Sequence, residues 1–250
     1  MYNHLGPFPG TFSAVSAIQD AGKELIVVTN NTTSYVDLIS KKFMDHGIDI
    51  PSDHIISSGL GLVWDEPAHT LVHKKKVYVY GWETSGQYVT DAGGIVVADL
   101  EEAEVICFAA SEKDDNEPHC RAVIEYMTKY PQVEGICINS DHYVIHEGEH
   151  FPVIGFYADL IEKAVPQSFY WVGKPESNMS GVVQKIMRQR FNTVLTDRAW
   201  FFDDNVDNVQ QFVIDLSVSG CVVLDTGLSL LSGFSGSNYS DLFNVSSFSI

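Results

Sequence analysis

The sequence has little positive charge. Only 15 of its 250 residues are lysine or arginine, against 33 aspartates and glutamates, and the formal net charge is −18. A surface of this sign repels the phosphate backbone of nucleic acids and anionic membranes. We therefore expect no nucleic-acid partner and no membrane partner. A small phosphorylated ligand would need a local cation or a metal ion to offset the same field.

Cysteines and long apolar runs are scarce too. The four cysteines are far apart and form no Cys-x-x-Cys pair, which argues against a disulfide framework or a zinc site and is typical of a reduced protein. No apolar run reaches the roughly 18 residues that a membrane span needs. The first ten residues lack the charged and apolar regions of a signal peptide. A cytoplasmic location is the resulting expectation.

What the chain does have is a regular alternation of strand and helix patterns. Residues 24–29 (ELIVVT) read as a strand buried on both faces of a parallel sheet. Further strand patterns alternate with helical ones, which we expect at 11–21, 34–46, 117–130, 176–190 and 206–218. Repeated alternation predicts an α/β architecture with a parallel sheet. From Thr226 onward the chain is rich in serine and its periodicity is weak.

Polar residues follow three of the expected strands. In "VVTNNTT", Thr29, Asn30 and Asn31 offer hydroxyl, amide and backbone N–H groups to an anion. The same residues also suit an ordinary turn that caps the next helix. Ligands of open parallel sheets bind beyond the carboxyl ends of the strands, so this position favours a binding role without proving one.

The other two strand ends carry charges. Lys174 in "WVGKPES" could neutralise a phosphate or carboxylate, or could be a surface lysine before a helix that Pro175 helps to start. Asp203 and Asp204 in "WFFDDN" supply the hard oxygens that Mg²⁺ prefers, or could simply cap a helix. Each motif is weak when taken alone.

Taken together, in this order and spacing, the motifs resemble the haloacid dehalogenase superfamily of phosphohydrolases. The most similar branch is subfamily IIA, which contains p-nitrophenyl, nucleotide and sugar phosphatases. The likeness runs from "PFPGTFSAVSAIQDAGKELIVVTNNTTS" to about Asp225, and "CINSD" resembles an Asn-x-Asp segment of the family's cap domain. The resemblance implies a Rossmann-like parallel-sheet core with an inserted α/β cap domain.

The resemblance also implies roles for individual residues. Thr29 would hydrogen-bond the transferring phosphoryl group, with Asn30 and Asn31 beside it, and Lys174 would balance its charge. Asp204, with Asp203 next to it, would bind Mg²⁺, and Asp141 would lie near the substrate. Thr29, Lys174 and Asp204 are expected to converge. The substrate would be a small phosphorylated metabolite, hydrolysed through an aspartyl-phosphate intermediate.

We expect residues 1–62 and 168–250 to form the core and residues 63–167 to form the cap. The segments "DEPAHT" (65–70) and "VPQS" (165–168) are the expected hinges, since each combines proline with polar residues. A homodimer formed through the cap is left open as an assembly.

One element of the family pattern is missing. The resemblance implies an Asp-x-Asp-Gly motif, with the nucleophile as its first aspartate, just before the segment that starts at Met1; the 250 residues contain no Asp-x-Asp. Two interpretations stay open: a phosphatase whose N-terminal strand is missing from the chain, or a catalytically inactive ligand-binding or scaffold protein. A more distant alternative is another doubly wound protein that binds phosphate or a nucleotide through Lys174 and Asp204.

Overall fold

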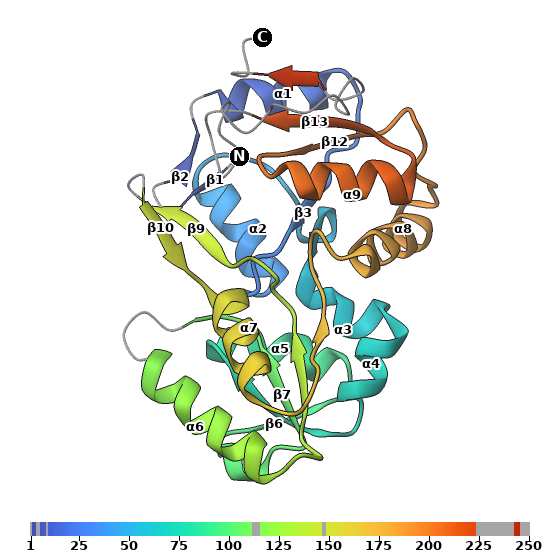
Figure 1. The fold of residues 1–250 in the computed structure, drawn as a ribbon. Helices are drawn as coiled ribbons and strands as arrows, with labels where there is room; N and C mark the ends of the chain where they lie inside the picture. Colours follow the sequence, from blue (N-terminus) through green and yellow to red (C-terminus); the bar gives the residue numbers. More distant parts are fainter. Residues whose placement is uncertain are drawn as a thin grey trace. The chain divides into compact units, whose positions relative to one another are not determined.

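The computed structural model describes residues 2–3, 6–8, 10–111, 116–146, 149–223 and 243–245 (Figure 1). The chain divides into two compact units, which we call the first unit and the second unit. The first unit comprises Met1–Val28, Val36–Ile56 and Leu195–Ile250. The second unit comprises Thr29–Tyr35 and Ser57–Val194.

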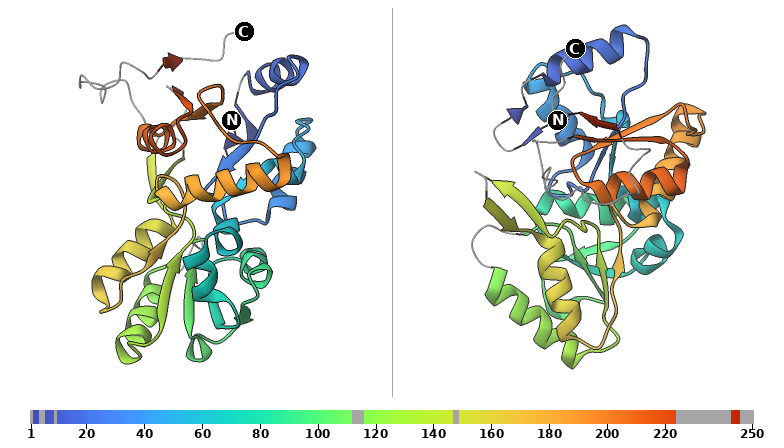
Figure 2. Two further views of the ribbon diagram at one scale, coloured as in Figure 1. Left: turned by 90° about the vertical axis from the view of Figure 1, so that its right-hand side faces the viewer. Right: turned by 45° about the horizontal axis from the view of Figure 1, so that its top comes forward.

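The second unit is built on a five-stranded sheet in which every neighbouring pair is parallel. In spatial order the strands are β11 (Tyr170–Trp171), β8 (Glu134–Cys137), β7 (Val105–Phe108), β5 (Lys76–Tyr80) and β6 (Ile95–Val97). Helices α6 (Asn116–Lys129) and α7 (Ile154–Ala164) cover one face, and α4 (Glu66–Val72) and α5 (Gly86–Asp91) cover the other (Figure 2). This arrangement confirms the expected α/β class.

Burial explains the apolar composition of the central strands. All four residues of β7 are buried, and β8 is buried after its first residue. Phe108 and Tyr80 lie 5.7 Å apart between ring centroids, and Phe169 stacks on Phe108 at 5.0 Å. These rings belong to one apolar cluster with α6 and α7. A strand covered by helices on both sides has no solvent-facing position, so polar residues are excluded from it.

Shorter elements and one long helix lie outside this sheet. The second unit also contains α3 (Gly61–Trp64) and α8 (Ser177–Phe191). The 3₁₀ turns are η1 (Ser52–His54), η2 (Ser58–Leu60), η3 (Glu83–Ser85) and η4 (Leu100–Glu102).

One strand of segment 168–250 belongs to the sheet of segment 63–167. Strand β11 hydrogen-bonds to β8, and both lie in the second unit. "DEPAHT" is also not a linker: Asp65 caps α4 by accepting a hydrogen bond from the Ala68 N–H at 3.3 Å, and the proline stands in the first turn. Proline with an acidic residue marks helix starts as well as hinges, and here the helix start prevails.

An antiparallel hairpin was not expected. Strands β9 (Tyr143–His146) and β10 (Glu149–Pro152) pair from Tyr143 opposite Pro152 to His146 opposite Glu149. Helix α7 begins after the hairpin, at Ile154. The hairpin follows Asp141 directly, so it extends from one of the expected site residues.

The first unit contains the remaining elements. Its helices are α1 (Thr11–Asp20), α2 (Val36–Asp45) and α9 (Val206–Leu216). Its sheets are the parallel set β12 (Trp200–Asp203), β13 (Ser219–Val223) and β14 (Phe243–Val245), and the antiparallel pair β1 (Tyr2–Asn3) and β2 (Gly6–Pro7). Strands β3 (Val27–Thr29) and β4 (Ile55–Ser57) pair with each other, and the last residue of each belongs to the second unit. Strand β14 is the part of the serine-rich tail that the structure describes; the rest lies outside the described residues.

Strand β3 is less buried than its apolar sequence predicts. All three of its residues are only half-buried, because among the described residues β3 belongs to a two-stranded sheet and not to the middle of a wide one. In strand β12, exposed side chains alternate with covered ones. Trp200 and Phe202 are 50% and 46% exposed, while Phe201 stacks on Phe212 of α9 with 4.1 Å between ring centroids. The expectation of a strand buried on both faces was wrong for β3.

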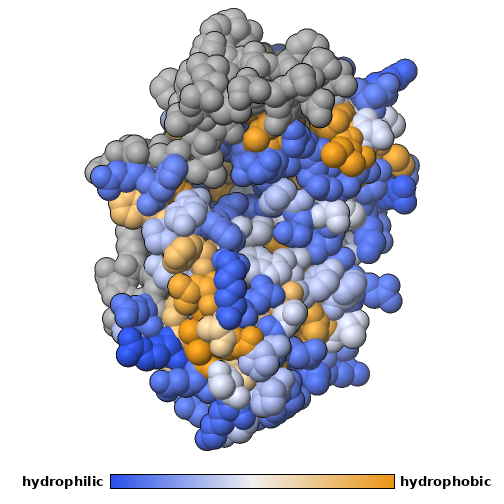
Figure 3. Space-filling model, in the orientation of Figure 1, coloured by the Kyte–Doolittle hydropathy of each residue, from blue (hydrophilic) through white to orange (hydrophobic). Residues whose placement is uncertain are grey.

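The visible face of the molecule carries mostly hydrophilic residues, with apolar ones in small patches (Figure 3). No helix among the described residues is long and apolar enough to cross a membrane.

Candidate functional site

The segment from Thr29 to Tyr35 is held by side chains of the second unit. The Ser85 hydroxyl donates to the Thr32 carbonyl at 2.8 Å, and the Tyr88 hydroxyl donates to the Ser34 carbonyl at 2.9 Å. Thr32, which is fully buried, donates in turn to the Ala109 carbonyl. A loop with this many anchored carbonyls has a fixed path, so the residues at its start are held in place.

Asn30 makes the most informative contacts of this segment. Its side chain is 2% exposed, and it forms two hydrogen bonds with the backbone of one residue, Lys174. The Lys174 N–H donates to Asn30 Oδ1 at 2.8 Å, and Asn30 Nδ2 donates to the Lys174 carbonyl at 2.8 Å. The side-chain amide therefore pairs with the lysine backbone as a neighbouring strand would.

Asp141 joins the same cluster. Asn30 Nδ2 also donates to Asp141 Oδ1 at 2.8 Å, and the Ser140 hydroxyl donates to the Lys174 carbonyl at 2.5 Å. Asn30, Ser140, Asp141 and Lys174 thus come together from the ends of β3, β8 and β11. These contacts bring Asn30 and Asp141 beside the Lys174 backbone; the expected convergence of Thr29, Lys174 and Asp204 stays a prediction, and so do the roles of these residues.

The loop that carries Asp141 is shaped by its own hydrogen bonds. The Asp141 N–H donates to Asn139 Oδ1 at 3.0 Å, and the Cys137 thiol donates to the Asn139 carbonyl at 3.1 Å. Burial is the main reason why the pKa of Cys137 is raised far above its usual value. The thiol therefore stays neutral and can act as a donor in this loop.

Gly173 is required by the close approach of these groups. Its φ of +125° is a conformation that side-chain-bearing residues rarely adopt. A Cβ there would lie 2.9 Å from Ser140 Oγ and 3.0 Å from Asn30 Oδ1. The glycine of "GKP" thus allows the lysine backbone to reach Asn30.

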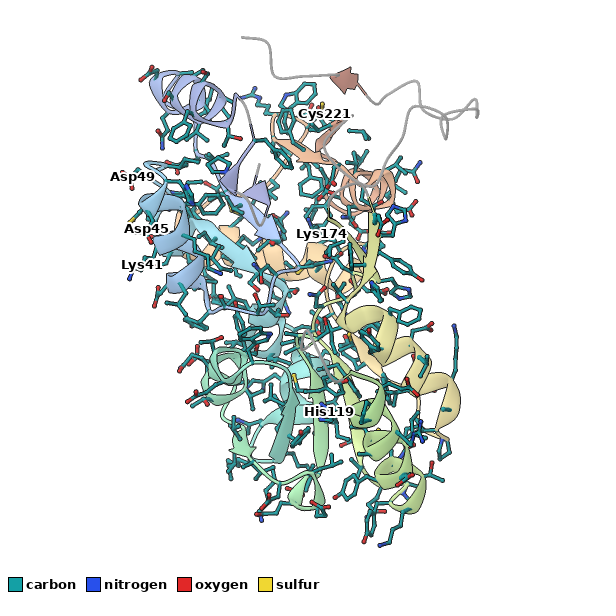
Figure 4. The ribbon with its side chains drawn as sticks, turned by 90° about the vertical axis from the view of Figure 1, so that its left-hand side faces the viewer. Lys41, Asp45, Asp49, His119, Lys174 and Cys221 are labelled. Carbon is teal, nitrogen blue, oxygen red and sulfur yellow. The ribbon has the colours of Figure 1, made fainter. Side chains whose placement is uncertain are left out.

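Lys174 itself is only 8% exposed. Figure 4 shows it beyond one end of the five-stranded sheet, whereas His119 lies alongside the strands. A buried ammonium is costly unless negative groups surround it. This burial excludes the alternative interpretation of Lys174 as an ordinary surface lysine, and it makes the end of β11 a position suited to an anion.

Thr29 and Asn31 lie at the start of the same segment. Thr29 Oγ1 accepts a hydrogen bond from the Asn31 N–H at 3.1 Å, so its hydroxyl hydrogen can still be donated elsewhere. Asn31 Oδ1 accepts from the Thr33 N–H at 3.0 Å and from Thr33 Oγ1 at 2.7 Å. Only Nδ2 of the Asn31 amide carries hydrogens, so a hydrogen bond from this side chain to an anion would come from Nδ2.

Asp203 and Asp204 belong to the first unit. Asp203 ends β12, and its Oδ1 accepts from the Asn205 N–H at 2.9 Å and from Asn208 Nδ2 at 3.0 Å. Asp203 therefore shapes the loop before α9, but the residue that caps this helix is Asn205, whose side chain accepts from the Asp207 N–H at 2.9 Å. The described residues contain no group of three or more His, Cys, Asp or Glu side chains that could hold a metal ion.

Two residues of the cluster were missed from the sequence. Ser140 and Gly173 each precede an expected site residue, so "SD" and "GK" could have been taken as pairs. Neither pattern shows by itself that the serine would donate to the lysine carbonyl.

Known proteins can now be compared with this arrangement. A family model described as haloacid dehalogenase-like hydrolase matches residues 1–94. The p-nitrophenyl phosphatase from Archaeoglobus fulgidus is 18% identical in sequence and superposes with a TM-score of 0.74, covering 94% of this chain and 85% of that one. The chain has a haloacid dehalogenase-like fold.

Two further structures share this haloacid dehalogenase-like fold. A possible sugar phosphatase of the superfamily from Cytophaga hutchinsonii is 19% identical with a TM-score of 0.76, covering 92% of this chain and 83% of that one. A glycerol phosphate phosphatase from Mycobacterium tuberculosis in complex with calcium is 16% identical with a TM-score of 0.71, covering 89% of this chain and 62% of that one. No protein with a curated function matches the sequence.

The resemblance drawn from the strand-end motifs is thereby confirmed at the level of the fold, and the family model supports it over residues 1–94. The assignment of residues 1–62 and 168–250 as core and 63–167 as cap stays a prediction, and so do the roles of the site residues.

Proposed function

We propose that this haloacid dehalogenase-like chain binds the phosphate group of a small phosphorylated metabolite and has the site chemistry of a phosphohydrolase. The observation that carries the proposal is the buried Lys174 at the end of β11, with its backbone fixed by Asn30. The phosphatases of similar fold support the reaction class. The net charge of −18 makes such a local cation necessary for any phosphate ligand.

The residues of the second unit would divide the work of binding. The Lys174 ammonium offsets the negative charge of the phosphoryl group. The Thr29 hydroxyl donates to a phosphoryl oxygen while its own oxygen stays bonded to the Asn31 N–H. Asn31 Nδ2 is a further donor. Asp141, at the base of the β9–β10 hairpin, would lie near the part of the substrate that leaves.

A divalent cation would assist, and we propose Mg²⁺ with Asp204 as one ligand. The calcium complex of the similar glycerol phosphate phosphatase supports a divalent cation in general. The cation would neutralise phosphoryl oxygens when bound. Asp203 contributes less, because its Oδ1 already accepts two hydrogen bonds from the loop. Since the described residues form no complete metal site, we derive no step of the reaction through it.

Hydrolysis through an aspartyl phosphate also needs a carboxylate nucleophile. The 250 residues contain no Asp-x-Asp, so these residues alone should bind phosphate without hydrolysing its esters. The same observation favours a second candidate function: a ligand-binding or scaffold protein on this fold. Both functions share the phosphate site and differ in turnover.

The location and assembly are part of the proposal. Four free, buried cysteines suit a reducing compartment, and we propose the cytoplasm. A homodimer through segment 63–167 is the proposed assembly, and the edge strand β6, with Ile95 and Val96 exposed by 55% and 45%, is the surface to test.

Calorimetric titration with inorganic phosphate in the presence of Mg²⁺ tests the proposal. We expect saturable binding and a loss of affinity of about 10- to 100-fold in Lys174→Ala, the size of a lost charge-assisted contact. The control is Lys185→Ala, because Lys185 is an exposed lysine of α8 whose Nζ donates to the Trp64 carbonyl at 2.9 Å. Absence of binding by the unmodified chain, or equal affinity in Lys174→Ala, would contradict the proposal.

A further inference from the structure

The side-chain amide of Asn30 has a fixed orientation. The Lys174 N–H can only donate, so the atom of Asn30 that faces it must be Oδ1. The Lys174 carbonyl and the Asp141 carboxylate can only accept, so the atom that faces them must be Nδ2. All three contacts therefore agree on a single placement of the amide.

This placement uses the donors of the amide completely. Nδ2 has two hydrogens, and its two acceptors at 2.8 Å are the Lys174 carbonyl and Asp141 Oδ1. Ser140 Oγ, at 3.4 Å, is more distant and itself donates to the Lys174 carbonyl. A hydrogen bond from Asn30 to a phosphate would require the release of one of these partners. The side chain is also 2% exposed, so a ligand has little access to it.

We infer that Asn30 is a positioning residue that orients the Lys174 backbone and holds Asp141 beside it, and not a phosphate ligand. The inference rests on the proposed function, in which Lys174 meets the phosphate. Two hydrogen bonds to the N–H and C=O of one residue fix the position of its backbone and hence the starting direction of its side chain. The third bond connects that lysine to the loop that leads into the β9–β10 hairpin.

The chemistry of the position explains why asparagine is needed. Aspartate has the same shape and could still accept from the Lys174 N–H, but it has no hydrogen to donate and would set a carboxylate against Asp141. Alanine would remove all three bonds. Glycine at 173 is part of the same arrangement, because a Cβ there would lie 3.0 Å from Asn30 Oδ1.

An exchange of the two side chains separates positioning from direct binding. In Asn30→Asp, affinity for inorganic phosphate should fall by about tenfold or more, since two buried donors are lost and two carboxylates face each other. In the double variant Asn30→Asp/Asp141→Asn, the new amide at 141 can donate to the new carboxylate at 30, and the net charge returns to its original value. Phosphate affinity should then recover in part, to within about tenfold of the unmodified chain and well above that of Asn30→Asp, because residue 30 still cannot donate to the Lys174 carbonyl.

Direct binding predicts a different result. If Asn30 donated to phosphate, the carboxylate in the double variant would repel the anion, and the exchange at Asp141 would not restore affinity. A folded double variant without recovery, or an Asn30→Asp variant with unchanged affinity, therefore overturns the inference. A chain that binds no phosphate before any substitution contradicts the proposed function instead.

Two further measurements separate positioning from simple loss of stability. Amide exchange at Lys174 should be faster in Asn30→Ala, because its N–H loses its acceptor. Ser40→Ala is the control, since Ser40 is 4% exposed in the first unit and donates to the Ile50 carbonyl at 2.7 Å. It should lower the melting temperature without changing phosphate affinity or exchange at Lys174. Slow exchange at Lys174 in Asn30→Ala would also overturn the inference.

Discussion

At the scale of single residues, position was predictable but partners were not. Thr29, Lys174 and Asp204 each follow an apolar run, which predicts that each lies at the end of a buried strand. Ligands of parallel sheets bind beyond such strand ends. The spacing does not say which group each side chain will bond. For Asn30 the sequence predicts a polar residue at a strand end, but not that its amide pairs with the Lys174 backbone. Only the folded loops decide this, since their hydrogen bonds join residues 144 positions apart.

Replacement of Gly173 tests the close approach at this site. Gly173→Ala should lower the free energy of unfolding by about 1–3 kcal/mol, the cost of a strained backbone conformation, and should weaken phosphate binding. The matched control is Gly22→Ala. Gly22 has a φ of +63° but nothing within 4 Å of an added Cβ. Gly22→Ala should lower the free energy of unfolding by only about 1–2 kcal/mol, the cost of a left-handed conformation, and should leave phosphate affinity unchanged. Equal affinity in both variants would contradict the role of Gly173.

Thiol reactivity gives a second test at this scale. Burial raises the pKa of Cys107 to about 12 and also raises that of Cys137, so both thiols stay protonated at pH 8. Both thiols should resist an aromatic disulfide reagent in the native protein and react in urea. Mass spectrometry of the labelled peptides would show this, and rapid native labelling of either residue would contradict the packing of β7 and β8.

At the scale of elements, the long periodic segments were predicted well and the short ones were not. Helices α1, α2, α8 and α9 begin and end within about two residues of the expected positions, because each carries an apolar face and a stop signal. The β9–β10 hairpin was missed, since each of its strands has only four residues. "DEPAHT" was misread because helix caps and hinges use the same residue types.

Helix α8 offers a stabilising substitution. Gly181 lies inside this helix, and an added Cβ would meet nothing within 4 Å. Gly181→Ala should therefore raise the free energy of unfolding by about 0.5–1 kcal/mol, the difference in helix propensity between the two residues. Urea unfolding followed by circular dichroism would measure it. A loss of stability would mean that α8 is not helical at this position.

The turn η1 contains a pH-dependent contact. Burial lowers the pKa of His54, but hydrogen bonds to Asp53 at 2.8 Å and Glu24 at 3.0 Å outweigh it, so the pKa lies above its ordinary value of 6.5. The folded protein binds this proton more tightly than the unfolded chain does, which stabilises the fold at pH values below the histidine pKa of the unfolded chain. The stabilisation is lost as the pH rises through the pKa of His54 in the folded protein. The effect should be small because these carboxylates are exposed.

Comparison of the chain with His54→Gln measures this contribution. The difference in free energy of unfolding should be larger at pH 5.5 than at pH 8.5, because the contribution of a group with a raised pKa is lost as the pH rises. An equal difference at both pH values, or a larger one at pH 8.5, would show that the histidine is not held by these carboxylates in solution.

At the scale of the whole molecule, the β–α alternation was sufficient to predict the fold class. Parallel neighbours need a crossover helix, so alternation and parallel sheets occur together. The limits of the two units were harder to predict, because strand β11 follows the expected cap in sequence yet pairs with β8.

The proposed metal can be tested separately from the lysine. Phosphate affinity should be higher with Mg²⁺ than with a chelator, because the cation offsets charge that Lys174 alone leaves. Asp204→Asn should reduce this difference, while Asp215→Asn, at an exposed position of α9, should not. If the chelator has no effect on phosphate affinity, the metal is not part of the site.

The central claim is that Lys174 serves a phosphoryl-transfer site, and hydrolysis of p-nitrophenyl phosphate tests it most directly. The 250-residue chain should release negligible phosphate, because loss of a nucleophile costs about 10⁶-fold in rate in a well-studied hydrolase. A chain extended at its N-terminus by a strand ending in Asp-x-Asp-Gly should gain Mg²⁺-dependent turnover. That turnover should be abolished by Lys174→Ala and preserved by Lys185→Ala. Robust turnover by the 250 residues alone, or turnover in the extended chain that survives Lys174→Ala, would contradict the account.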